Sequence, residues 1–242
     1  MTAGPRLTTA ALGAVAATAA AHALPMARAH GPLRRFSPRF AGQGRPGGVA
    51  LTFDDGPDPL GTPAVLGELD RLGWTATFFL LGSQVRAFPD TAREVVTAGH
   101  EIAVHGDVHR SHLIRTPRDV RRDIARALAE ISEVTGTRPR WYRAPYGHVS
   151  AGTMRAAAAV GLEPVVWTAW GCDWRGGPAA EVLRHVVRGL EDGGTVLLHD
   201  SDCTSAPGSW RTTVASLPLL AAEFVRRGLA VRPLRDHLPG RA

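Results

Sequence analysis

The chain has 242 residues, which is enough for one domain of good size, and barrels of alternating strands and helices often reach this length without dividing. Its formal net charge of +6 would ordinarily suggest nucleic acid or an anionic surface as a partner. All 28 basic residues are arginine, however, and no nucleic-acid motif or aromatic interleaving accompanies them, so we expect no nucleic-acid partner.

An uncharged, alanine-rich stretch lies near the start of the chain. Residues 8–26 follow a lone Arg6 and resemble a secretory signal or a weak membrane anchor, with conceivable cleavage sites after Ala23 and Ala29. If the stretch stays in the membrane, the arginines that follow it favour a cytoplasmic-facing domain, whereas a cleaved signal exports the domain. We assign residues 1–29 to this segment and favour a secreted or cell-envelope location, with membrane association and a cytoplasmic-facing domain as alternatives.

The next stretch divides this segment from the predicted domain. Residues 30–48 are rich in arginine, proline and glycine and predict a basic linker, so the domain should span residues 49–242. Two cysteines, Cys172 and Cys203, are too few for a disulfide framework. We expect two separate buried thiols, and a disulfide is the alternative for an exported domain.

From residue 49 on, short apolar runs alternate with longer helical patterns. The apolar runs predict buried strands at 49–53, 76–80, 101–104, 141–143, 164–167, 195–198 and 229–232. The helical patterns lie at 62–72, 89–98, 117–135, 151–160, 178–192 and 210–227. This alternation predicts a parallel α/β sheet with right-handed crossovers, either as an incomplete barrel or as an open doubly wound sheet.

Threonine, proline and glycine punctuate the predicted helices. Thr62-Pro63 and Thr116-Pro117 predict helix starts, because threonine caps a first turn and proline is tolerated at the first helical position. Glycines predict left-handed helix ends at positions 73, 99, 136, 161, 193 and 228.

Side chains suited to metal binding or proton transfer follow five of the predicted strands. They are Asp54-Asp55, His105 with His109, Arg143, Asp173 and His199. In both candidate architectures a ligand site lies beyond the carboxyl ends of the strands. We therefore expect these side chains to converge on one site.

Each group has a chemical use. Asp54 and Asp55 are adjacent at a strand end and point in different directions, so one can bind a metal while the other faces a water; an Asp-Gly-Pro turn with solvated acids is the alternative. His105 and His109 are four residues apart and can reach one ion, which with a carboxylate makes three ligands of an open zinc site.

Two further residues suit support and proton transfer. Arg143 can keep a neighbouring carboxylate ionised and oriented, and a structural ion pair is the alternative. His199 can donate a proton if an acid orients it, and a capped core histidine is the alternative.

The order of these motifs resembles the polysaccharide deacetylases, carbohydrate esterase family 4, also described as the NodB homology domain. The matching motifs are Thr-Phe-Asp-Asp-Gly-Pro at 52–57, Gly-His-Glu-Ile-Ala-Val-His at 99–105 with His109, Arg-Ala-Pro-Tyr-Gly at 143–147, Asp173-Trp174, and Leu-x-His at 197–199. The resemblance covers residues 49 to 232. It implies a distorted (β/α)7 barrel and metal-dependent removal of acetyl groups from an N-acetylated or O-acetylated polysaccharide, such as peptidoglycan or a chitin-like polymer.

The resemblance also implies a role for each residue of the predicted site. Asp55, His105 and His109 would bind a divalent transition metal, with zinc expected. Asp54 would be the general base, steadied by Arg143, and His199 the general acid, oriented by Asp173. Tyr146, Trp174 and Leu197 would shape the acetyl pocket, and the backbone amide of Tyr146 would serve the oxyanion.

Two positions depart from the family pattern. Gly106 stands where serine or threonine commonly follows the first histidine, so a hydroxyl bond that stabilises the loop is lost. Trp170 stands where an acid usually precedes the Asp-Trp pair by three residues. Both positions lie outside the expected metal and proton-transfer set, so we expect activity to survive with an altered rate or substrate preference.

Two other functions fit the same sequence. One is a hydrolase of the same fold that acts on a small amide, and a lidded cavity in place of an open one would favour it. The other is a catalytically silent carbohydrate-binding protein, suggested by Gly106, Trp170 and the many aromatic residues. Asp54 and His199 argue against the silent protein, because binding alone needs neither a base nor an acid.

Overall fold

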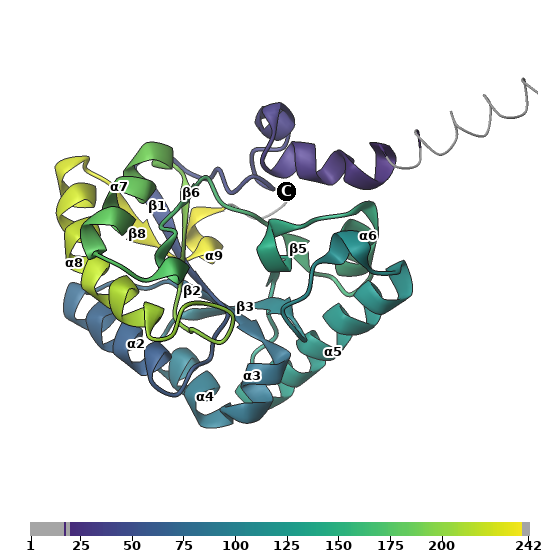
Figure 1. Ribbon diagram of the computed structural model, residues 1–242, viewed down its shortest axis with the longest axis horizontal. Coiled ribbons are helices and arrows are strands. Elements are labelled where there is room, and N and C mark those ends of the chain that lie inside the picture. The colour runs from purple at the N-terminus through teal and green to yellow at the C-terminus, as the bar shows by residue number, and fades with distance from the viewer. Residues whose placement is uncertain (1–16, 18–19, 239–242) are drawn as a thin grey trace, which may run out of the picture.

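A computed structural model of the chain describes residue 17 and residues 20–238. Parallel strands form a curled sheet, and helices surround it on the outside (Figure 1). The strands follow the order β5-β4-β3-β2-β1-β7-β6, and β8 pairs with β1 beside β2. Their bounds are β1 Gly48–Asp54, β2 Thr77–Leu81, β3 Glu101–Gly106, β4 Trp141–Tyr142, β5 Glu163–Pro164, β6 Ala169–Trp170, β7 Thr195–His199 and β8 Ala230–Arg232.

The crossovers between strands are helical, as a parallel sheet requires. The α-helices are α2 Gly61–Leu72, α3 Gly82–Ala87, α4 Pro89–Thr97, α5 Pro117–Thr135, α6 Ala151–Ala159, α7 Ala179–Gly189, α8 Ser209–Arg226 and α9 Leu234–His237. Short 3-10 helices are η1 Pro32–Phe36, η2 His112–Ile114, η3 Pro145–Gly147 and η4 Asp173–Arg175. The predicted distorted barrel is confirmed, with the sheet left open between β5 and β6.

Alternation along the strands separates an outer core from the barrel interior. In β1, Val49, Leu51 and Phe53 belong to the large cluster that packs under the helices. Ala50 belongs to a smaller cluster with residues from the other strands and from α9. Because successive side chains of a strand point to opposite faces, the residues that alternate with the outer core, including Asp54, face the interior.

The interior is closed at the amino ends of the strands. Leu234, which begins α9, and Leu238, which directly follows it, pack there with Trp141 of β4. The backbone N–H of Leu234 donates to Thr77 Oγ1 at the start of β2, and that of Arg235 donates to Glu101 at the start of β3. The opposite end of the barrel, where the five polar stretches lie, is left for a site.

Most predicted helix boundaries are confirmed within about one residue. Thr116 caps α5 by accepting from the backbone N–H of Asp119, and Gly73 and Gly136 are left-handed helix ends. The predicted cap at Thr62 is wrong, because α2 begins one residue earlier and Asp58 accepts from the N–H of Gly61 instead.

Two predicted elements differ from the structure. The helix expected at 178–192 ends at Gly189, well before the glycine at 193. The strand expected at 164–167 is replaced by two short strands, β5 and β6. The expected strand stops because the backbone N–H of Val166 donates to Phe40, outside the sheet.

The predicted linker lies against the barrel. Residues 39–43 contact both sides of the opening between β5 and β6: Arg39 forms an ion pair with Glu163, and Gly42 accepts a hydrogen bond from Thr195 of β7. The buried Ala41 lies between them. Part of the segment predicted to be a basic linker therefore packs against the barrel.

The predicted signal or anchor segment is described only in part. Residues 1–16 and 18–19 lie outside the described residues, while residues 20–29 are helical and Ala29 is buried. Within the described chain no helix has the length and apolar character that a membrane crossing requires. Cys172 and Cys203 are free thiols, and Cys203 is exposed, contrary to the expected burial of both.

Candidate active site

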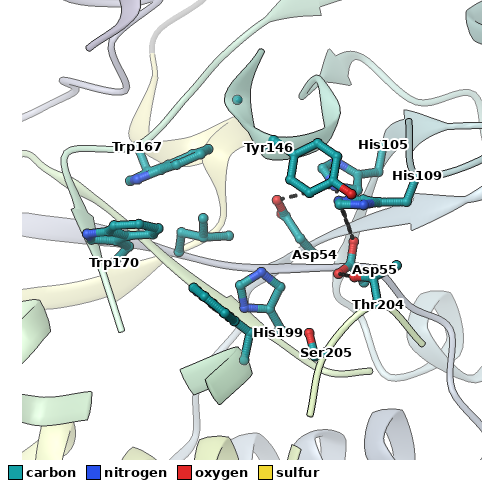
Figure 2. A pocket seen from close by; sticks show the side chains of 13 residues that line it. Asp54, Asp55, His105, His109, Tyr146, Trp167, Trp170, His199, Thr204 and Ser205 are labelled. Carbon is teal, nitrogen blue, oxygen red and sulfur yellow. Dashed lines mark hydrogen bonds and ion pairs between the residues drawn. The ribbon is translucent and has the colours of Figure 1, made fainter. Parts of the chain in front are cut away.

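A cavity of about 220 Å³ lies at the carboxyl ends of the strands (Figure 2). Eight of the ten predicted site residues line it, and Arg143 and Asp173 are buried in contact with Asp54 and His199, respectively. The lining residues are Asp54, Asp55, His105, His109, Tyr146, Gly147, Trp167, Trp170, Trp174, Leu197, His199, Thr204 and Ser205.

Left-handed backbone brings two adjacent carboxylates to this one cavity. Asp54 ends β1 and faces the barrel interior, so a regular strand would turn Asp55 to the opposite side. Asp55 instead has φ +78°, a conformation that is uncommon for residues other than glycine. Tyr146 and Cys172, the latter directly before Asp173, also have positive φ. Strain of this kind tends to gather at functional sites.

Asp55, His105 and His109 form a three-residue cluster. Asp55 Oδ1 lies 3.3 Å from His105 Nε2 and 3.4 Å from His109 Nε2. One ligand atom from each residue lies within 4.8 Å of the other two. These spacings suit three ligands of one ion, and Figure 2 shows the three side chains pointing toward one another.

The hydrogen bonds around this cluster fit a cation. His105 Nδ1 lies 3.0 Å from the carbonyl oxygen of Arg143, so Nδ1 donates there and Nε2 is the ring nitrogen that an ion beside Asp55 would meet. Burial lowers the pKa of His109 to about 4, which leaves that imidazole neutral at pH 7. Asp55 Oδ1 is buried and accepts no hydrogen bond from any described residue, although Thr204 donates to Oδ2 at 2.6 Å. A divalent cation would satisfy all three facing atoms.

Asp54 is held by a buried arginine. Arg143 Nη1 donates to Asp54 Oδ1 at 2.7 Å and to Thr52 Oγ1 at 2.9 Å, and both charged side chains are buried. The other oxygen, Asp54 Oδ2, lies 3.7 Å from His105 Nε2, beside the cluster. Removing one partner of a buried pair typically costs about 3–5 kcal/mol, so each partner fixes the other in place.

His199 is held by an acid from η4. Its Nδ1 lies 3.0 Å from Asp173 Oδ1, so Nε2 is the free ring nitrogen on the cavity side. Thr213 of α8 donates to Asp173 Oδ2 at 2.7 Å and fixes the carboxylate. Burial lowers the pKa of His199, but the charges and hydrogen bond of Asp173 outweigh it and raise that pKa to about 9. His199 is therefore protonated at neutral pH.

The three predicted substrate-contacting residues all line the cavity. Leu197 lies two residues before His199 on β7 and is buried, while Trp174 belongs to η4. The ring of Tyr146 meets the ring of His109 edge to face at 4.3 Å between centroids. Tyr146 is 57% exposed at the rim, so the cavity opens to solvent beside it.

The loop after the first histidine is anchored without a hydroxyl. Gly106 has φ +113°, and a Cβ at this position would lie 2.9 Å from Asp123 Oδ2. That same oxygen accepts a hydrogen bond from the backbone N–H of Asp107, and Arg115 donates to Asp123 Oδ1. The buried carboxylate of Asp123 thus holds the segment that leads to His109.

The second departure changes the surroundings of Arg143. Trp170 lines the cavity and offers no acceptor in place of an acid. Arg143 Nε is buried without a hydrogen-bond partner among the described residues. The guanidinium lies over the ring of Phe79 at 4.0 Å and near that of Trp167 at 5.6 Å. Asp54 is therefore its one carboxylate partner in the described part of the chain.

Sequence reasoning missed several supporting residues. Thr204 follows a strand end in the loop after β7, and its position there is a weak signal that could have been used. Asp123 and Thr213 lie on helices among other polar residues, and nothing in the sequence pattern singles them out.

Comparisons with known proteins agree with this geometry. A profile described as Polysaccharide deacetylase matches residues 41–165, just over half of the chain. A chitooligosaccharide deacetylase of Bradyrhizobium sp. (strain ANU 289) is 35% identical over 194 residues, which cover 77% of this chain and 88% of that protein. The peptidoglycan-N-acetylglucosamine deacetylase PgdA of Listeria monocytogenes is 35% identical over 177 residues, which cover 73% of this chain but 37% of PgdA.

A solved structure shares the fold. The crystal structure of a peptidoglycan N-acetylglucosamine deacetylase, bound to a naphthalenyl N-oxidanyl-benzamide, superposes with a TM-score of 0.75 at 26% identity. The match covers 81% of this chain and 91% of that one. Sequence, fold and site geometry lead to the same conclusion: the chain is a member of the polysaccharide deacetylase family, carbohydrate esterase family 4.

Proposed function

We propose that this protein is a metal-dependent hydrolase that removes acetyl groups from the N-acetylglucosamine units of a polysaccharide. The observation that carries the proposal is that Asp54 and His199 line the same cavity as the Asp55, His105 and His109 cluster. A base, an acid and a cation-binding cluster in one cavity are what hydrolysis of an amide needs. The named relatives act on chitooligosaccharide and peptidoglycan, which share this sugar unit.

Asp55, His105 and His109 would hold the ion. Two imidazole nitrogens and one carboxylate oxygen suit zinc, with another divalent transition metal as the alternative. When bound, the ion would polarise the acetyl carbonyl and make water more acidic.

Asp54 would act as the base. It would take a proton from the water that attacks the acetyl carbon, while Arg143 holds the carboxylate toward the cavity. The backbone N–H of Tyr146 would donate to the oxygen on which negative charge develops. Leu197 and Trp174 would enclose the acetyl methyl group, since both line the cavity.

His199 would act as the acid. As the C–N bond breaks, it would donate the Nε2 proton to the leaving amine, and Asp173 would stabilise the charged ring through Nδ1. The proton is available because the pKa of His199 is raised to about 9, burial notwithstanding. The alcohol of an acetyl ester leaves more readily than the amine of an acetamide and depends less on an acid. An acid at this position therefore supports N-deacetylation over O-deacetylation.

The rim favours a polymer over a small amide. Tyr146 is 57% exposed and Trp170 is 43% exposed, so the cavity opens to solvent between aromatic side chains. A covered cavity would suit a small amide better.

The cell envelope is the proposed location. A glycan substrate of this kind lies outside the cytoplasm, and residues 1–29 would carry the domain there as a signal or an anchor. Ala29 is buried and Met26 Sδ contacts the backbone of Val149, which supports retention of the residues from Leu24 onward.

Acetate release tests the function. The full chain, loaded with zinc, should release acetate from β-1,4-linked N-acetylglucosamine tetramer and from peptidoglycan strands, but not after treatment with a chelator. Tetramer and polymer recovered fully acetylated from the zinc-loaded protein would contradict the proposal.

A further inference from the structure

We propose that Trp167 and Trp170 form a sugar-stacking subsite on one wall of the cavity, which binds a pyranose ring next to the unit that is deacetylated. The proposal rests on the proposed function, because it names how the polymer is held at that same site. Trp170 stands where the family pattern has an acid, so the subsite is a feature of this chain.

The two tryptophans stack against each other on one wall of the cavity. Their ring centroids are 6.2 Å apart and their planes are inclined by 29°, so Trp167 supports the ring of Trp170 (Figure 2). Ala169 packs into the outer core, so the alternation of β6 turns Trp170 toward the barrel mouth. There Trp170 remains 43% exposed.

Trp167 is fixed before any ligand binds. The ring of His30 lies 5.0 Å from it, and the Arg143 guanidinium lies near its face. Gly147 is so close that a Cβ there would lie 2.7 Å from Trp167. A wall that is already immobilised loses little side-chain entropy when it binds a ligand.

The position of the two tryptophans relative to His199 indicates which sugar unit of the polymer they would contact. Trp170 pairs in register with Leu197, two residues before His199 on β7. His199 serves the leaving nitrogen, and that nitrogen carries the sugar chain, so the chain leaves the cavity on the side of His199. The tryptophan wall lies there, while the Asp55, His105 and His109 cluster lies on the other side of the cavity (Figure 2).

The chemistry of the wall fits a β-linked N-acetylglucosamine oligomer. The face of such a pyranose presents C–H groups, whereas its hydroxyls lie around the edge and stay in water. Aromatic faces bind apolar surface of this kind, and the indole N–H adds a hydrogen-bond donor at the ring edge. Neither tryptophan carries charge, so an anionic ligand is not what this wall selects.

Binding by the metal-free full chain separates this subsite from catalysis. The Kd of the chelated protein should be measured for N-acetylglucosamine and for its β-1,4-linked tetramer, in wild type, Trp170→Ala and Trp170→Phe. We expect Trp170→Ala to weaken tetramer binding about tenfold, with monomer binding unchanged, and Trp170→Phe to stay within about threefold of wild type. Phe36→Ala is the matched control, because Phe36 is an exposed aromatic residue outside the cavity.

Each outcome decides a different claim. Equal tetramer affinity in wild type and Trp170→Ala, with both proteins folded by circular dichroism, would overturn the subsite even if acetate is released. Tetramer binding that depends on Trp170, without acetate release by the zinc-loaded protein, would overturn the proposed function and keep the subsite. KM for acetate release from the tetramer and from peptidoglycan strands, measured in zinc-loaded wild type and Trp170→Ala, distinguishes the polymers. A KM raised by Trp170→Ala for the tetramer, the strands or both supports the subsite and names its ligand, and a KM unchanged for both would overturn it.

Discussion

Asp173 contacts His199 through both of its carboxylate oxygens: Oδ1 lies 3.0 Å from the ring nitrogen Nδ1, and Oδ2 accepts from the backbone N–H at 2.7 Å. The acid therefore fixes both the position and the charge of the histidine. The pKa of His199 is raised to about 9, because the negative charge and hydrogen bond of Asp173 outweigh burial. The protonated form that donates to the leaving amine is present below this pKa and is lost as pH rises through it.

Asp173→Asn should move the alkaline limb of kcat/KM to lower pH. The neutral amide no longer stabilises the charged ring, so the pKa of His199 falls from about 9 toward or below its ordinary value of 6.5. A bound cation lowers the limb in both proteins, so the comparison is made at equal metal loading. The pH profile of acetate release measures the shift, and coincident profiles of wild type and Asp173→Asn would show that Asp173 does not determine the pKa of His199.

Asp54→Asn should abolish turnover while the metal stays bound. The amide cannot accept a proton from water, and loss of such a group typically lowers the rate by about 10²–10⁴. Acetate release and metal content by atomic emission are measured on the same sample. His105→Ala is the paired variant, and it should lose both metal and activity. Wild-type turnover in Asp54→Asn would remove Asp54 from the role of base.

Zinc should raise the thermal stability of the metal-free protein, because an ion that binds only the folded state stabilises it by mass action. The shift in Tm should grow with zinc concentration and disappear in His109→Ala, which lacks one of the three ligands. This readout does not depend on catalysis. An equal shift in wild type and His109→Ala would mean that zinc binds elsewhere.

Asp123→Ala should weaken metal binding without touching a ligand. The carboxylate accepts from the backbone N–H of Asp107, at 3.0 Å, in the segment between His105 and His109. Loss of such a supporting group typically costs about 10–100-fold in metal affinity. Asp123→Asn keeps an acceptor oxygen and should retain most of the affinity. If zinc titration gives Asp123→Ala the wild-type Kd, the segment is held by other contacts.

Deletion of residues 1–45 should destabilise the domain, whereas deletion of residues 1–19 should not. The longer deletion removes Arg39 from its ion pair with Glu163 and opens the space between β5 and β6. Loss of about 2 kcal/mol lowers Tm by about 4–8 °C for a domain of this size. Calorimetry on both deletions gives the answer. Equal Tm values for the two deletions would support the predicted start of the domain near residue 49.

The sequence predicts the barrel because its signals are local. The apolar run of β1 and the amphipathic stripe of α5 each reflect one element packing on one face, so their positions are found within one or two residues. The opening between β5 and β6 depends on a distant segment. No local pattern shows that Phe40 accepts from Val166, so the shortening of that strand could not be predicted.

The site is predictable to the extent that it follows from strand ends. Asp54 and His199 follow buried strands, and the topology brings them to one cavity. The left-handed backbone of Asp55, the anchoring of its loop by Thr204 and the carboxylate of Asp123 under Gly106 depend on how loops and helices meet in space. The sequence marks Gly106 as a lost hydroxyl, but the structure is needed to identify its replacement.

The proposed function requires one cation held by Asp55, His105 and His109, and anomalous diffraction at the zinc edge shows whether that ion is there. Crystals of the full chain grown with zinc should show a single strong anomalous peak in the cavity, at about 2.0–2.2 Å from Asp55 and from both Nε2 atoms. A cavity without such a peak, in crystals that bind zinc at other places, would contradict the account.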